Sequence, residues 1–193
     1  MITQRQAKTQ ATKQRIIDAA LLLFTQKGVD ATTTRHIAAA AEIAEGTLYR
    51  HFESKEALAK DLFEGEFLPF AKRLQEVSQG TGSTLSKIAA TVHHFYQAFD
   101  GDVARWSYIM TYQGGPQSKV SADILTPIKL MQKLLEEGVV KNELSVNDIP
   151  LMAQILVGII EHPALGLIYE EIKGPLANSE KEVVAAIGKI LRV

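Results

Sequence analysis

The sequence predicts an all-α protein of about nine helices, with an N-terminal three-helix domain followed by a larger helical domain. Apolar residues recur at spacings of three and four along almost the whole chain, which is the period of a helix with one buried face. No stretch shows the alternation of apolar and polar residues that is typical of a strand. A chain of 193 residues can form one large hydrophobic core or two smaller ones.

The first three helices are short and closely spaced. The first is expected over residues 12–27, because Gly28 follows at the position where a helix commonly ends in glycine. A short second helix follows the stretch DATTT at 30–34, whose threonine hydroxyls can cap free backbone amides. A third helix of about two turns is expected over 45–51.

Glycine- and proline-containing breaks separate the remaining six helices. Their expected ranges are 54–77, 83–99, 103–112, 118 or 127 to 137, 148–172 and 179–192. Ser54 and Ser83 are placed as caps, and Ser179 has capping-box spacing to Glu182. Pro69 is expected to kink or split the fourth helix, and Pro127 either kinks or starts the seventh.

Charge and composition narrow the possible functions. Residues 1–60 carry nine Lys and Arg against six Asp and Glu, so this basic third of the chain favours an anionic partner. Its first part, with Arg5, Lys8 and Lys13, is expected to be disordered. The chain has no cysteine, which fits a reducing cytoplasm, and its polar start does not resemble a secretory signal. A cytoplasmic location is therefore expected.

Two other classes of protein are disfavoured. The stretch 149–169 is long enough to cross a membrane, but Glu161 and His162 would be costly in lipid, so we expect a buried helix and no membrane contact. The sequence also lacks the motifs of common enzyme classes, because it has no glycine-rich phosphate loop with its lysine and no cysteine nucleophile. His93 and His94 are adjacent, so they diverge on a helix and cannot share one metal. We expect no enzyme activity, no cofactor and no metal.

Residues 33–52 have the layout of a helix-turn-helix, in which the second helix enters the DNA major groove. Thr33, Thr34 and Arg35 begin the first of its two helices, where free amides attract a phosphate. The outward positions of the second helix carry two hydroxyls, a guanidinium and an imidazole, those of Thr47, Tyr49, Arg50 and His51. Lys55 follows in the next helix as a further phosphate ligand.

Three segments carry a resemblance to a known family: RIIDAALLLFTQKG (15–28), TTTRHIA (32–38) and EGTLYRHFESKEAL (45–58). They resemble the TetR family of bacterial transcriptional regulators. The resemblance implies a homodimeric DNA-binding regulator, with a DNA-binding domain at 1–54 and a helical ligand-binding and dimerisation domain at 55–193. Matched by position, the DNA contacts of the family fall on Thr33, Thr34, Arg35, Gly46, Thr47, Tyr49, Arg50, His51 and Lys55.

This resemblance also implies a function: repression at a palindromic double-stranded operator, relieved by a small molecule. Three residues depart from the usual pattern. Glu42 stands where the turn commonly has glycine, Ala44 where a Ser or Thr cap is common, and Glu45 where lysine is frequent. These departures leave an alternative open, a helical small-molecule-binding module that has lost DNA binding. Otherwise DNA binding is expected to survive with lower affinity, or with Glu45 accepting a hydrogen bond from a cytosine amino group in the operator.

The larger domain offers candidate groups for an apolar or aromatic effector. Aromatic and histidine side chains lie on the helices at 83–99 and 103–112 and beside Pro163. The candidate ligand residues are His93, Tyr96, Phe99, Trp106, Met110 and His162. The last two helices, 148–172 and 179–192, are expected to pair across a two-fold axis in a homodimer, since Gly158 and Gly166 allow close packing.

Overall fold

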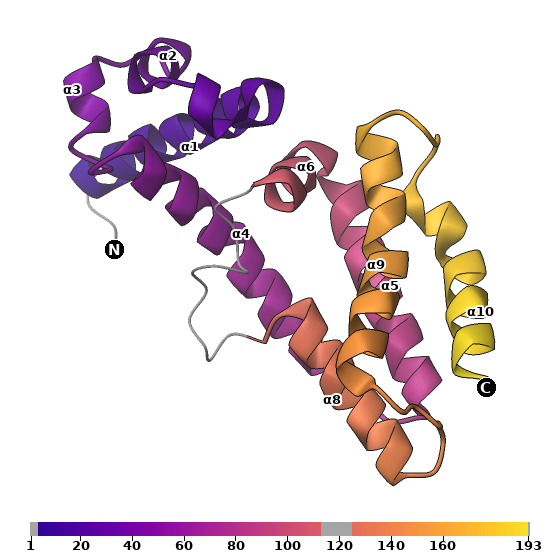
Figure 1. The fold of residues 1–193 in the computed structure, drawn as a ribbon. Helices are drawn as coiled ribbons and strands as arrows, with labels where there is room; N and C mark the ends of the chain where they lie inside the picture. Colours follow the sequence, from indigo (N-terminus) through magenta and orange to yellow (C-terminus); the bar gives the residue numbers. More distant parts are fainter. Residues whose placement is uncertain (1–3, 113–124, 193) are drawn as a thin grey trace. The chain divides into compact units, whose positions relative to one another are not determined.

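The computed structural model describes residues 4–112 and 125–192. This part of the chain contains nine α-helices, one short 3-10 helix and no strand, which confirms the predicted all-α class (Figure 1). The chain divides into two compact units, one formed by residues 1–67 with 104–119 and the other by 68–103 with 120–193. The expectation that the seventh helix starts near 118 falls outside the described residues.

The first unit is built around α1 (Gln4–Ala31). The helix begins eight residues before the predicted start, so the expectation of disorder around Arg5, Lys8 and Lys13 was wrong. Residues 4–11 are all exposed and are polar or alanine, so no periodic apolar face predicted a helix there. Gly28 has a φ of 78° and interrupts the helix where its end was predicted.

Two short helices follow and form the predicted helix-turn-helix. These are α2 (Thr34–Ala40) and α3 (Glu45–Leu48), and residues 49–51 continue as a turn rather than as the predicted helix. Each helix anchors itself by one large side chain, since Ile37 and Leu48 are both fully buried. Helix α1 contacts α2, and α2 contacts α3, so the three form one small core.

Helix α4 (Lys55–Ser78) contributes its first part to one unit and its second part to the other. The Ser54 hydroxyl accepts from the Ala57 amide at 3.0 Å, as predicted for a cap. The helix continues past Pro69 without a break. In the first unit, Tyr108 of α6 (Val103–Thr111) stacks on Phe24 and donates its hydroxyl to the Ala59 carbonyl at 2.8 Å. Burial raises the pKa of this hydroxyl.

The second unit packs four helices beside the last part of α4: α5 (Thr84–Gly101), α8 (Pro127–Val140), α9 (Ile149–Ile168) and α10 (Glu180–Leu191). Helix α8 contacts α5 and α9, and α10 contacts the same two helices. Pro127 starts α8 behind the Thr126 cap. Ser179 makes no side-chain cap, because it lies at the end of the 3-10 helix η1 (Leu176–Ser179) in helical conformation. The predicted capping box was wrong.

Helix α9 is long and apolar enough to span a membrane by length and composition alone. Within the described chain, a third of its apolar window is buried, including Leu156 and Ile160 against the second unit's core. A core helix of a soluble protein passes the same test, so the length of α9 carries little weight.

Candidate nucleic-acid interface

The turn between α2 and α3 has a strained residue at its centre. Glu42 has a φ of 53°, a conformation that suits glycine far better than a side chain. The Arg15 guanidinium supports this turn by donating to the Ala41 carbonyl and, at 2.9 Å, to the Glu42 carbonyl. The turn therefore keeps its geometry without the expected glycine. Sequence reasoning missed Arg15, whose partners lie 26 and 27 residues away.

Most of the predicted DNA-contacting side chains lie on the surface of this helix-turn-helix. Thr33, Arg35, Gly46, Tyr49 and Arg50 are exposed, and Thr34, Thr47, His51 and Lys55 are partly exposed. Thr33 is the cap of α2, since its hydroxyl oxygen accepts from the His36 amide at 3.2 Å. Ala44 makes no side-chain cap for α3, as its methyl group requires.

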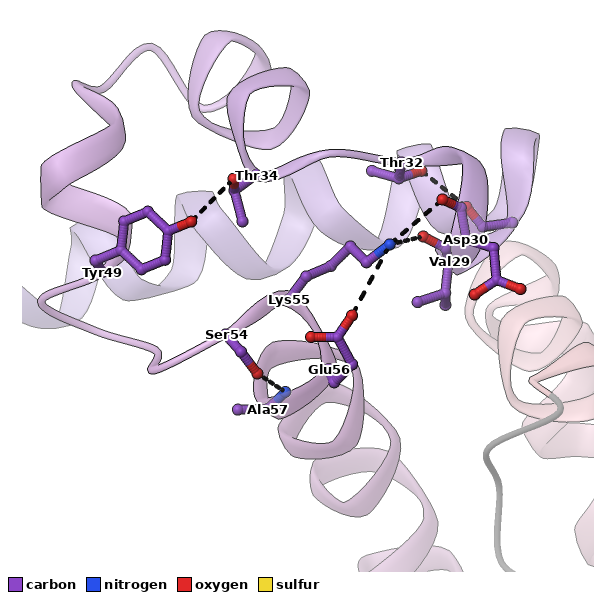
Figure 2. Close-up of polar contacts among 10 residues, drawn as sticks. Val29, Asp30, Thr32, Thr34, Tyr49, Ser54, Lys55, Glu56 and Ala57 are labelled. Atoms are coloured by element: carbon purple, nitrogen blue, oxygen red, sulfur yellow. Dashed lines mark hydrogen bonds and ion pairs between the residues drawn. The ribbon is translucent and has the colours of Figure 1, made fainter.

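A chain of hydroxyl groups links the two helices (Figure 2). The Thr34 hydroxyl donates to the Glu45 carboxylate at 2.7 Å and lies 3.3 Å from the Tyr49 hydroxyl. Within α3 and its turn, the Arg50 guanidinium donates to the Thr47 hydroxyl at 2.9 Å. The readout groups are thus held by one another before any partner arrives.

Lys55 is placed differently from the other candidates. Its ammonium group donates to the Val29 carbonyl at 2.7 Å and lies 3.4 Å from the Asp30 carbonyl, at the end of α1 (Figure 2). Glu56 is 4.0 Å away, and the Lys55 side chain is only 18% exposed. The lysine therefore ties α1 to the start of α4. Sequence reasoning assigned it to phosphate and missed this contact.

The candidate ligand residues are divided between the two units. Trp106 and Met110 belong to the first, and the remaining four, His93, Tyr96, Phe99 and His162, belong to the second. Tyr96 and Phe99 are fully buried, and His162 is exposed. The role of all six in ligand binding stays a prediction.

One open hollow of about 510 Å³ lies in the second unit. It is lined by Arg73, Val77, Ala89, Ala90, His93, His94, Gln97 and Glu180. The His93 imidazole lies 2.9 Å from the Glu180 carboxylate, which links α5 to α10. Burial lowers the pKa of His94, and the positive charge of Arg73 lowers it further.

Two buried polar atoms on α5, His94 Nε2 and the Tyr96 hydroxyl, have no hydrogen-bond partner among the described residues. Burial, with a smaller effect of the Glu180 charge, raises the pKa of Tyr96 to about 12. Among residues 4–112 and 125–192, no group of three histidine or acidic side chains could hold a metal ion.

Comparison with known proteins places this helix-turn-helix in a family. Residues 16–62 match the family model described as "Bacterial regulatory proteins, tetR family". Residues 16–62 belong to the TetR family. The match includes α2, α3 and the start of α4, and so all nine residues at which DNA contacts were predicted.

Relatives that match longer stretches of the chain are also named as transcription regulators. The HTH-type transcriptional repressor KstR2 of Rhodococcus jostii is 34% identical over 134 residues, which are 64% of this chain and 63% of that protein, less than two thirds of its length. The HTH-type transcriptional regulator SrpR of Pseudomonas putida is 26% identical over 178 residues, which are 90% of this chain and 81% of that protein.

A solved structure has a similar fold over most of the chain. The transcriptional regulator FadR from Bacillus subtilis, solved in complex with stearoyl-CoA, aligns with a TM-score of 0.71 at 20% identity. The alignment covers 90% of this chain and 96% of that one. The helix-turn-helix is accordingly the DNA-binding unit of a transcription regulator.

Proposed function

We propose that this chain is a homodimeric repressor that binds a palindromic operator through α3 and is released from it by a small molecule. In this proposal residues 1–54 bind DNA, and residues 55–193 bind the effector and form the dimer. The expected location is the cytoplasm, where such an operator lies.

The observation that best supports DNA binding through α3 is the presence of glycine at position 46. Gly46 is exposed in α3, its φ is not positive, and a Cβ added there would meet no atom within 4 Å. Glycine in a helix costs about 0.5–1 kcal/mol of stability relative to alanine, and nothing in the fold requires it here. A partner that approaches the backbone of α3 closely would explain why this position is glycine, since any side chain would stand in the way. The major groove of DNA is such a partner for a recognition helix.

The side chains around Gly46 suit the same partner. Arg35 and the Thr33 hydroxyl, at the start of α2, are assigned to phosphates, together with His51. Arg50 is assigned to a base edge, since a guanidinium can donate two bonds to guanine. Thr47 keeps Arg50 in place through its 2.9 Å bond. The modest net charge of −1 is no objection, because these cations lie together on one unit.

Exposed apolar side chains on the last two helices support the homodimer. Leu151 and Ile155 of α9 are 56% and 42% exposed, and Ile190 of α10 is 40% exposed. All three line one open hollow of about 800 Å³ in the second unit. Burying them against a second copy would stabilise a dimer. A two-fold axis would then present two α3 helices to a palindromic site.

The effector is proposed to bind in the second unit, in which His93, Tyr96, Phe99 and His162 are candidate contacts. Two observations support this: the Tyr96 hydroxyl is buried without a described partner, and a hollow lies beside His93. A buried hydroxyl without a partner costs free energy that a ligand could recover. Helix α4 belongs partly to each unit, so a shift of α4 would couple effector to DNA.

The test is a titration of the full-length protein with DNA from upstream of its own gene and with a random pool, at several salt concentrations. Saturable binding that selects a sequence is expected. The Arg50→Ala variant should bind with relaxed preference at one base pair per half-site, at a cost of about 1–3 kcal/mol on the preferred sequence. If no DNA sequence is selected, the alternative of a helical ligand-binding module without DNA binding replaces the proposal.

A further inference from the structure

The hydroxyl chain on the helix-turn-helix has a fixed direction. An ionised carboxylate only accepts hydrogen bonds, so the single proton of the Thr34 hydroxyl points to Glu45, 2.7 Å away. That proton is then not available to Tyr49. The 3.3 Å contact between the two hydroxyls must therefore have Tyr49 as its donor. Thr34 therefore holds the carboxylate, and Tyr49 holds the Thr34 hydroxyl.

Glu45 is held in this way but is not neutralised. It is exposed, and no lysine or arginine in the described ranges lies within ion-pair distance of it. One carboxylate oxygen is fixed by Thr34, and the other has no described partner. A negative charge at this place repels phosphates, so it does not serve general affinity for DNA. A carboxylate in the first turn of α3 stabilises the helix dipole, and its free oxygen can also accept a hydrogen bond from a donor on the DNA.

We propose that Glu45 reads a cytosine in each half-site by accepting a hydrogen bond from the N4 amino group, with Thr34 and Tyr49 as positioning residues. This inference rests on the proposed DNA-binding function. Cytosine presents only the N4 donor to the major groove. Adenine places the N7 acceptor beside its donor, and guanine and thymine present acceptor oxygens, all of which a carboxylate repels. Cytosine is therefore the base that a fixed carboxylate favours.

The two linked hydroxyls fix the position of the Glu45 side chain before DNA binds, Thr34 directly and Tyr49 through Thr34. A free glutamate side chain loses rotamer freedom when it binds, which weakens its contact. The bond from Thr34 fixes the carboxylate against α2 before DNA arrives. Removing that bond should weaken the preference for cytosine without changing which base is preferred.

The experiment selects binding sequences from a random duplex pool with the full-length protein and its variants, then measures affinities for single-base changes. The wild-type protein should prefer cytosine about tenfold at one position of each half-site. The Glu45→Ala variant should lose this preference, and Glu45→Gln should move it toward adenine, with which an amide pairs through two bonds. The Thr34→Val variant should keep cytosine with its preference reduced about threefold.

The matched control is Glu53→Gln, which removes an exposed negative charge nearby in the chain and should leave every base preference unchanged. Circular dichroism melts check that each variant is folded. If the Glu45 variants bind all sequences more tightly with the same preference, Glu45 only repels DNA and the inference fails while the proposed function stands. If the wild-type protein selects no sequence, both fail.

Discussion

At the scale of single residues, substitution of Gly46 should have opposite effects on the stability of the fold and on the affinity for DNA. Replacing it by alanine should raise the free energy of unfolding by about 0.5–1 kcal/mol, because no atom lies near the added Cβ and the unfolded chain loses freedom. The same methyl group would stand between α3 and DNA, so the affinity for DNA should fall by about tenfold or more. Urea melts and DNA titrations measure the two effects.

Gly65 provides the matched control for this prediction. It is an exposed glycine in α4 with equally empty surroundings, so Gly65→Ala should gain stability and leave DNA affinity unchanged. Unchanged DNA binding by Gly46→Ala would remove the observation on which the proposed function rests.

A second prediction at this scale tests whether Lys55 stabilises the fold or binds a phosphate. Its ammonium group bonds to carbonyls at the end of α1, so Lys55→Met should lower the free energy of unfolding by about 1.5–3 kcal/mol. Lys60→Met is the control, since Lys60 is well exposed and only approaches Glu64 at 3.7 Å; it should change stability by less than about 0.5 kcal/mol. Unchanged stability with a salt slope reduced by about one would instead make Lys55 a phosphate ligand.

The sequence could predict which residues gather on the helix-turn-helix but not which of them bond to one another. Lys55 and Val29 are 26 residues apart, and their contact depends on where α1 ends relative to the start of α4. Arg15 reaches the α2–α3 turn for a similar reason. Such contacts are set by tertiary packing, which periodicity and spacing do not specify.

At the scale of elements, helices with a periodic apolar face were predicted correctly and their ends less so. The predicted stripe of Leu85, Ile88, Val92, Phe95 and Phe99 identified α5, and all of these side chains are buried except Leu85, which is half-buried. The start of α1 was missed, because its polar residues have helix propensity without an apolar period. The 3-10 helix before α10 was missed because Ser179 looks like a cap in sequence.

Helix α9 carries a glutamate whose burial gives a pH dependence. Burial raises the pKa of Glu161 to about 7, from 4.5 for an unperturbed side chain. The folded state therefore binds more protons than the unfolded state between these values, and stability falls as the pH rises from about 4.5 to 7. The Glu161→Gln variant should lose this part of the pH dependence and be more stable than wild type at pH 8, by about 1–2 kcal/mol.

Thermal melts at pH 5 and pH 8 measure this effect. Gln75→Glu serves as the control, because it places a carboxylate on an exposed position of α4, away from the proposed dimer surface of α9 and α10, and should add little pH dependence. Equal pH profiles for wild type and Glu161→Gln would contradict the assignment.

At the scale of the whole molecule, the exposed apolar side chains of α9 and α10 predict a dimer. The wild-type protein should have the mass of two 21.2 kDa chains in solution. Ile155→Glu places a charge among Leu151 and Ile190 around the same hollow, where burial of an unpaired carboxylate would be costly, and should yield monomers. Val140→Glu changes an apolar side chain that is 81% exposed on α8 and should leave the dimer intact.

The dimer prediction also determines how affinity depends on the operator. In a dimer, binding of one α3 presents the second to its half-site at high effective concentration, which can strengthen binding by a factor of about 10² to 10⁴. A monomeric Ile155→Glu variant should lose this factor on a palindrome but bind an isolated half-site as wild type does. Sedimentation and DNA titration on both sites separate the two effects. Equal losses on the half-site and the palindrome would mean that the substitution damages the fold, and full affinity from a monomer would contradict a two-fold operator.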